Sequence, residues 1–191
     1  APSRGLGDVY KRQEKSMEML VKTIVANYIL EGIYFYSGFM FFYNLGRNQL
    51  MPGSVQEIRY INRDENTHLW LFRNILIELK KEQPDLFTEQ YIDEYRSMIK
   101  EGCEQEIKWG HYVIGDDVQG LNGEMITDYV QYLGNLRCTN LGFAPIYEGH
   151  ETEPESMRWV SQYSNANAIK TDFFEARSTA YAKSSALVDD L

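Results

Sequence analysis

The sequence predicts an all-α protein, and three observations support this class. Apolar residues recur at three- and four-residue steps along most of the chain, as they do on one face of a helix. No segment shows the period-two alternation of a half-buried strand, and no internal repeat is present. Hydrophobic residues make up 43% and aromatic residues 14% of the 191 residues, which is enough for one substantial core.

The first helix is expected over residues 14–47, and its apolar stripe contains an acidic residue. Glu31 lies in the middle of that stripe. The segment Thr23–Leu45 is about as long as a membrane span, but a central glutamate is costly in lipid and the flanking charges show no orienting asymmetry. We therefore expect a buried helix of a soluble protein here. The stripe consists of Leu20, Ile24, Tyr28, Phe35, Phe39, Phe42 and Leu45.

The second helix is expected from Ser54 to about Glu82 and repeats this anomaly. Ser54 and Glu57 form the Ser-x-x-Glu pattern of a capping box. Glu65 and His68 fall within the apolar stripe, and their i, i+3 spacing directs both side chains from one helix face. The stripe consists of Val55, Ile58, Ile61, Leu69, Phe72, Leu76 and Leu79.

Glu31, Glu65 and His68 are candidate metal ligands. A buried carboxylate beside a buried imidazole is costly unless it is compensated, and a metal ion compensates both groups. A lone glutamate on one helix and Glu-x-x-His on the next is half of the pattern of a dinuclear carboxylate site in a four-helix bundle. The other half is not in this sequence. A metal-free polar network satisfied by Arg63, Asn66 or tyrosine side chains is the alternative.

Two further long helices are expected, over residues 88–113 and 122–140. Beyond residue 141 the pattern loosens into a glutamate-rich loop with one short helix. His111 and His150 have no ligand partner at helical spacing, so we expect them to be structural or solvated.

The two ends of the chain differ from the helical region in composition. Residues 1–13 have no amphipathic repeat and resemble a translated adapter, so they are expected to be extraneous or disordered. Residues 14–164 are expected to form the helical bundle. Residues 165–191 end in small and polar residues, a composition typical of a flexible tail that binds a partner.

Charge and cysteine content limit the partners and the compartment. The formal charge of −9 without a basic cluster argues against a nucleic-acid surface. Cys103 and Cys138 lie far apart on expected helices, and we interpret them as reduced thiols of a cytoplasmic protein.

Several motifs resemble the small, radical-generating subunit of class I ribonucleotide reductase. They are Glu31–Phe39, Ile61–His68, Glu104–Trp109, Gly120–Asn122 and Tyr132–Arg137, so the resemblance covers the chain from about residue 13 onward. It implies a ferritin-like helical bundle, incomplete here because its N-terminal helices are missing. It also implies a dinuclear iron cofactor (manganese with iron in some members), a homodimer of the small subunit and a large catalytic subunit as partner.

The resemblance implies roles for the candidate ligands and for one neighbour. Glu31 matches the lone carboxylate of the second metal-binding half, and Glu65 with His68 matches the Glu-x-x-His of that half. Asp64 matches the aspartate that hydrogen-bonds a metal-bound histidine and joins the radical-transfer route, although its partner histidine is absent from this sequence.

Four further residues match positions that serve the radical. Phe35, Phe39 and Ile61 match the apolar pocket around it, which keeps a reactive oxidant away from water. Tyr181 resembles the tyrosine that relays the electron to the large subunit. The alternative for Tyr181 is a tail aromatic with no redox role.

The expected function is that of the small subunit of ribonucleoside-diphosphate reductase, which generates and stores a metal-linked radical for reducing ribonucleotides to deoxyribonucleotides. The family's other carboxylate, its other Glu-x-x-His and its radical tyrosine would precede residue 13. The chain is therefore expected to be the C-terminal part of a longer protein and inactive alone.

Two alternatives remain, another ferritin-like dinuclear iron oxidase or monooxygenase and a metal-free helical interaction module. The tail with Tyr181 disfavours the former, and metal analysis would distinguish the latter.

Overall fold

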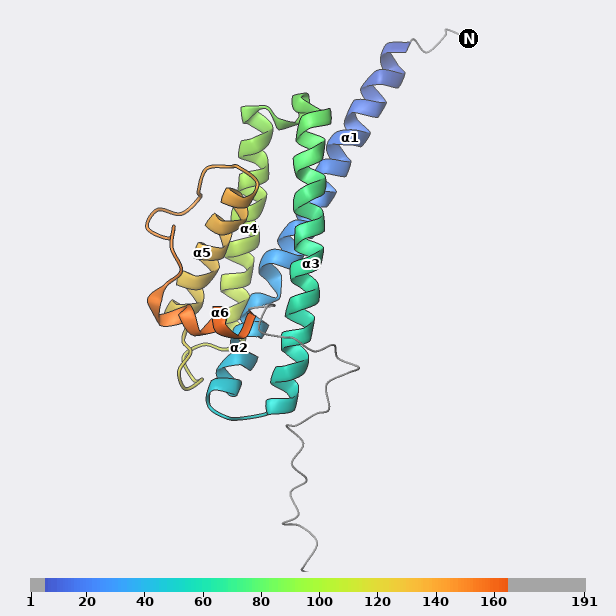
Figure 1. The fold of residues 1–191 in the computed structure, drawn as a ribbon. Helices are drawn as coiled ribbons and strands as arrows, with labels where there is room; N and C mark the ends of the chain where they lie inside the picture. Colours follow the sequence, from blue (N-terminus) through green and yellow to red (C-terminus); the bar gives the residue numbers. More distant parts are fainter. Residues whose placement is uncertain (1–5, 165–191) are drawn as a thin grey trace, which may run out of the picture.

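The computed structural model describes residues 6–164, and its regular structure is helical throughout this range (Figure 1). One isolated backbone bridge joins Val118 and Leu121, and no strand occurs between residues 6 and 164. The all-α prediction is therefore confirmed. The elements are α1 (Leu6–Ile29), η1 (Leu30–Tyr34), α2 (Tyr36–Arg47), α3 (Pro52–Glu82), η2 (Pro84–Phe87), α4 (Glu89–Val113), α5 (Gly123–Asn140), η3 (Glu155–Met157) and α6 (Arg158–Ser164).

The helices pack around η1, which is a π-helical turn of five residues. The long helices α3 and α4 run in opposite directions and are joined through η2 (Figure 1). Helix α1 contacts both α3 and α4, and α5 packs along α4. The turn η1 contacts α1, α2, α3, α4 and α5, so it lies at the centre of the bundle.

The expected single helix over residues 14–47 is interrupted, and it begins earlier than expected. Helix α1 starts at Leu6, so residues 6–13 are helical in the structure and continue into the bundle. The π turn η1 and Phe35 then separate α1 from α2. Apolar spacing did not reveal this break, because apolar residues occupy more than one face of this segment, and Ile33, Tyr36 and Met40 outside the expected stripe are buried.

The predicted capping box at Ser54 is wrong. Helix α3 begins at Pro52, with Met51 as the preceding residue in a left-handed conformation (φ 47°). Proline suits the first helical position because its missing N–H has no intrahelical partner there and its φ is already helical. Ser54 therefore lies inside the first turn and not at the cap.

The later helices match the sequence prediction closely. Helix α4 ends at Val113, and α5 runs over Gly123–Asn140. The Asn122 side chain accepts a hydrogen bond from the Met125 backbone N–H at 2.9 Å, which is a regular N-cap contact. Helix α6 is the short helix expected in the C-terminal part of the bundle.

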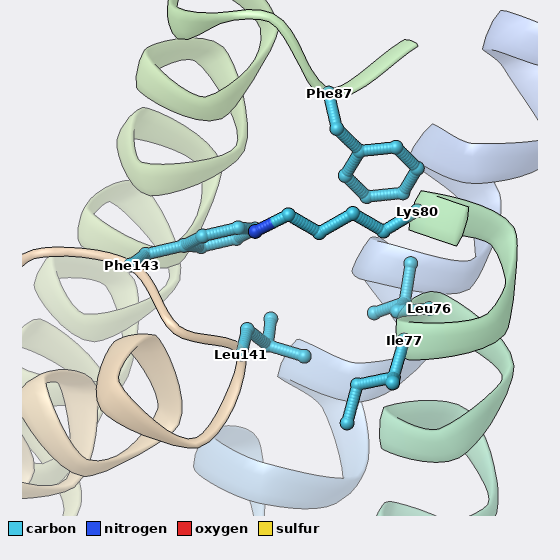
Figure 2. Close-up of a pocket in the computed structure, with 6 residues that line it drawn as sticks. All are labelled: Leu76, Ile77, Lys80, Phe87, Leu141 and Phe143. Carbon is cyan, nitrogen blue, oxygen red and sulfur yellow. The ribbon is translucent and has the colours of Figure 1, made fainter. Parts of the chain in front are cut away.

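The C-terminal end of α3 is packed against the segment that follows α5 (Figure 2). A small, mostly apolar hollow there is lined by Leu76, Ile77, Lys80, Phe87, Leu141 and Phe143. The Lys80 ammonium lies 5.7 Å from the centre of the Phe143 ring, a cation–π contact that leaves the lysine methylene groups over the apolar hollow.

The two cysteines lie in the core of the bundle. Cys103 and Cys138 are free and buried, as expected for reduced thiols. Among the helices of residues 6–164, none combines the length and the apolar character that crossing a bilayer requires.

Candidate metal centre

The turn η1 carries the first candidate ligand, Glu31, next to a break in the backbone hydrogen-bonding pattern. At the start of α2, the Ser37 backbone N–H donates to Glu106 Oε1 at 2.7 Å. Glu106 comes from α4 and is only 2% exposed, and this burial raises its pKa. A buried carboxylate at a helix N-terminus satisfies a donor that the helix itself leaves unpaired. Glu106 therefore helps to hold the segment that presents Glu31.

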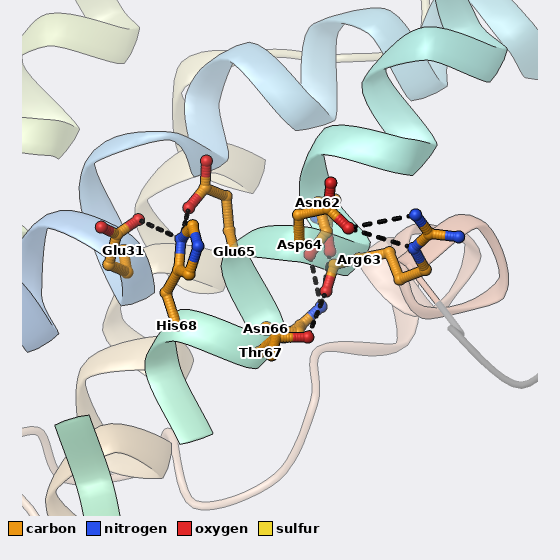
Figure 3. A network of polar contacts seen from close by, with 8 residues as sticks. All are labelled: Glu31, Asn62, Arg63, Asp64, Glu65, Asn66, Thr67 and His68. Carbon is orange, nitrogen blue, oxygen red and sulfur yellow. Dashed lines mark hydrogen bonds and ion pairs between the residues drawn. The ribbon is translucent and has the colours of Figure 1, made fainter. Parts of the chain in front are cut away.

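Helix α3 places Glu65 and His68 directly opposite Glu31 (Figure 3). His68 Nδ1 lies 2.9 Å from Glu65 Oε2 and 3.9 Å from Glu31 Oε2. One potential ligand atom from each of the three residues lies within 4.8 Å of the others. The structure thus brings together the three residues that the sequence singled out, whereas their metal-binding role stays a prediction.

The three side chains differ in exposure. Glu31 and Glu65 are 15% and 17% exposed, but His68 is 51% exposed. The expectation that His68 is buried is therefore wrong for the described chain. Neighbouring apolar residues on the same helix are also open to solvent, with Ile61 at 45% and Trp70 at 63%. Part of the apolar surface of α3 is therefore left uncovered by the other elements of residues 6–164.

The cluster is electrostatically unfavourable without a cation. Burial and the nearby Glu65 carboxylate raise the pKa of Glu31 to about 7. The hydrogen bond to Glu65 raises the pKa of His68. A divalent cation would relieve the repulsion between the two carboxylates, and a donor set of two carboxylates and one imidazole suits iron or manganese. The residues present therefore fit a metal ion.

The residues of the alternative polar network bond to other partners. Arg63 Nε donates to Asp64 Oδ1 at 3.1 Å, and Asn66 Nδ2 donates to the Asn62 carbonyl oxygen at 2.9 Å (Figure 3). Glu65 lies instead against His68 Nδ1. The Glu65–His68 hydrogen bond forms without a metal, so the assignment of these residues as ligands stays a prediction.

Asp64 lies apart from the three candidate ligands. Its side chain is 60% exposed and pairs with Arg63, away from Glu31 and His68 (Figure 3). The histidine that the resemblance pairs with this aspartate is absent from the sequence, so its hydrogen bond is not tested. The assignment of Asp64 to radical transfer stays a prediction.

The expected apolar pocket is only partly assembled by the described residues. Phe35 and Phe39 contact each other with ring centres 6.1 Å apart, and Phe39 is buried. Phe35 and Ile61 are 37% and 45% exposed, so these three side chains do not enclose a dry cavity within residues 6–164. Tyr181, the expected relay residue, lies outside the described residues.

The other two histidines contact polar groups elsewhere in the bundle. His111 Nε2 lies 2.8 Å from the Thr127 hydroxyl, and His150 Nδ1 lies 3.0 Å from the Glu148 carbonyl oxygen. Neither belongs to the one cluster of potential metal ligands found among the described residues.

Sequence reasoning missed two buried charged residues that contact this region. Glu106 and Arg137 are 2% and 4% exposed. Both lie at helical spacing from apolar residues, Glu106 after Ile99 and Cys103 on α4 and Arg137 after Leu133 on α5. The same criterion that singled out Glu31, a charge within an apolar stripe, could have found them.

Comparisons with known proteins identify the family of the chain. A family model described as "Ribonucleotide reductase, small chain" matches residues 4–154, which include most of the segment expected to be extraneous. The ribonucleoside-diphosphate reductase subunit beta of Treponema pallidum is 70% identical, over 100% of this chain and 55% of its own length. That of Halalkalibacterium halodurans is 42% identical, over 87% of this chain and 48% of its own length.

Solved structures show the same relation. The ribonucleotide reductase R2 subunit from Clostridium botulinum is 44% identical with a TM-score of 0.74, over 83% of this chain and 50% of that one. The chain thus spans about half the length of the relatives it matches. Its fold is the ferritin-like helical fold of R2 subunits, and the family model matches well over half of its residues. The chain therefore belongs to the ribonucleotide reductase small-chain family.

Proposed function

We propose that this chain provides one metal-binding half of the dinuclear centre in a ribonucleoside-diphosphate reductase small subunit, with Glu31, Glu65 and His68 as ligands. The observation that carries the proposal is the convergence of these side chains from two separate elements, η1 and α3, onto one point. A lone glutamate facing Glu-x-x-His is the arrangement that each half of such a centre uses.

The donor set favours iron, or manganese with iron, because it consists of two carboxylates and one imidazole and contains no thiolate. When bound, such a metal pair supplies the one-electron oxidising chemistry from which a radical is generated. The chain's own contribution is to hold the donors. His68 Nδ1 faces the carboxylates of both Glu65, at 2.9 Å, and Glu31, at 3.9 Å, so the donor atoms of the two elements already converge without a metal.

Further residues are assigned to protecting and transferring the radical. Phe35, Phe39 and Ile61 would form an apolar wall that excludes water, and the exposed faces of Phe35 and Ile61 offer surface for further residues to complete it. Asp64 has an exposed carboxylate that is accessible to a group outside the described chain. Asp64 and Tyr181 would belong to the route of radical transfer.

The proposed partners are a large catalytic subunit, which would reduce the ribonucleotides, and a second copy of the small subunit. The relatives' names identify them as subunits of ribonucleoside-diphosphate reductase, which supports this assignment. The cytoplasm is the proposed location.

Anaerobic titration with iron(II) tests the metal site. We expect weak binding of about one ion per chain, because only three protein ligands are present. His68→Ala should weaken binding at least tenfold. His111→Ala is the matched control and should bind as the parent does, since the His111 ring contacts a neighbouring threonine and not the cluster. Absence of binding by the parent would favour a metal-free interaction module. If His68→Ala binds iron(II) as tightly as the parent does, His68 is not a ligand.

The relay is tested in a complete small subunit. Tyr181→Phe should leave association with the large subunit intact and abolish nucleotide reduction, because phenylalanine cannot lose a phenolic proton with the electron. Deleting residues 187–191 should weaken association instead. Normal turnover by Tyr181→Phe would show that this tyrosine has no redox role.

A further inference from the structure

We propose that Arg137 is a positioning residue, which holds the π turn η1 so that Glu31 faces Glu65 and His68. The inference rests on the proposed metal site and adds a residue that acts through the backbone of η1. Arg137 comes from α5, an element that contributes no candidate ligand.

The first observation is a buried guanidinium without a carboxylate partner. Arg137 is 4% exposed, and it makes no ion pair with an acidic residue among the described residues. Its Nε donates to the Gly32 carbonyl oxygen at 3.0 Å, and its Nη2 donates to the Tyr36 hydroxyl at 3.1 Å. Burying an unpaired charge is costly, and the structure compensates it with these two bonds and with the Tyr36 ring, whose centre lies 5.7 Å from the guanidinium carbon.

The second observation is that both bonds fall on the segment carrying Glu31. Gly32 is the next residue after Glu31, and Tyr36 is the first residue of α2. In a continuing π-helix the Gly32 carbonyl would accept from the Ser37 N–H, five residues later. That N–H instead donates to Glu106. Arg137 thus donates a hydrogen bond to the Gly32 carbonyl at the point where the regular backbone hydrogen-bonding pattern of the helix is interrupted.

The third observation is the close approach between Gly32 and Arg137. A Cβ atom at Gly32 would lie 2.8 Å from Arg137 Nε and 3.0 Å from Leu69 Cδ1. The first contact is too short for a carbon atom and the second is unusually tight, so a larger residue would displace the guanidinium or the end of the Leu69 side chain. Glycine at this position is what allows the arginine to reach the backbone.

These contacts set the position of a ligand because, within the described chain, the polar partners of Glu31 are the other two members of the cluster. Moving the Gly32 carbonyl turns the peptide plane between Gly32 and Ile33, one residue beyond Glu31, and so shifts the turn that carries the Glu31 carboxylate relative to His68. Groups that orient metal ligands typically change metal affinity by 10- to 100-fold when they are removed. Loss of Arg137 should have an effect in this range.

The experiment compares Arg137→Gln with Arg73→Gln in the full chain. Arg73 is a matched control, because its Nε also donates to a backbone carbonyl, that of Asn140, at 2.9 Å and from a partly buried position. Manganese(II) affinity is measured by electron paramagnetic resonance of the free ion. Hydrogen exchange is measured across residues 30–36. Gly32→Ala is an independent second perturbation that acts on the same contact from the other side.

We expect Arg137→Gln and Gly32→Ala to weaken manganese affinity about tenfold and to speed exchange in residues 30–36. Arg73→Gln should change affinity by less than about twofold and leave that exchange unchanged. If Arg137→Gln does not fold, Gly32→Ala and Arg137→Lys decide the question by the same two measurements. Unchanged affinity and unchanged exchange would overturn the proposal.

The two proposals can fail separately. If the parent chain binds no manganese, the metal site fails, and the exchange data alone then judge Arg137. Faster exchange confined to residues 30–36 would still support its hold on η1, whereas uniform or absent changes would refute it.

Discussion

Replacing Glu31 by glutamine should stabilise the metal-free chain, and more so at alkaline than at acid pH. The ordinary pKa of 4.5 rises to about 7 in the folded chain, chiefly because burial disfavours the charged form and then because of the Glu65 carboxylate. Glutamine is nearly isosteric and carries no charge at any of these pH values. The substitution therefore removes the electrostatic cost and keeps the shape.

The sign follows from proton binding. Between pH 4.5 and about 7, the folded chain holds a proton on Glu31 that the unfolded chain has released. Stability therefore falls as pH rises through this window, and the full loss corresponds to about 3 kcal/mol. We expect Glu31→Gln to be about 3 kcal/mol more stable than the parent at pH 8.5 and about 1 kcal/mol more stable at pH 5.5. The raised pKa of His68 acts in the same direction, but its bond to Glu65 is common to both proteins.

Urea unfolding at the two pH values, with a chelator present, measures this difference. Glu57→Gln on the exposed side of α3 is the control, and it should change stability by less than about 0.5 kcal/mol. Saturating manganese(II) should reverse the order, because only the parent keeps all three ligands and ligand binding stabilises the folded state. A Glu31→Gln variant no more stable than the parent at pH 8.5 would refute the electrostatic account.

Three further predictions concern the scaffold. Asn135→Ala should lower the free energy of unfolding by more than about 2 kcal/mol in urea titrations, because the Asn135 side chain makes four hydrogen bonds to the loop after α5; a loss below about 0.5 kcal/mol would contradict this. Asn122→Ala should cost about 1 kcal/mol by removing the N-cap bond to Met125, whereas Asn122→Ser should cost much less. Thiol labelling at pH 8 should be slow for folded Cys103 and Cys138, because burial raises their pKa values to about 12 and about 11, and fast in denaturant. Rapid labelling of the folded chain would show that the core opens.

The sequence alone determined the helical class and the candidate ligands. Helical spacing depends on local geometry, so apolar residues at three- and four-residue steps located α4 and α5 with accurate boundaries. Charges inside such stripes are costly, and the order of residues by itself therefore made Glu31, Glu65 and His68 stand out. The folded chain brings their ligand atoms together.

Other features depend on contacts between distant segments, which spacing along the chain does not record. Around the π turn, Arg137 of α5 donates a hydrogen bond to Gly32, and Glu106 of α4 accepts one from Ser37. Both residues lie more than sixty positions from the turn in sequence. The exposure of His68 likewise depends on which helices cover α3, not on its place within the apolar stripe. A stripe predicts which face of a helix is apolar, whereas only the packed structure decides how much of that face is covered and which backbone groups need a partner from another helix.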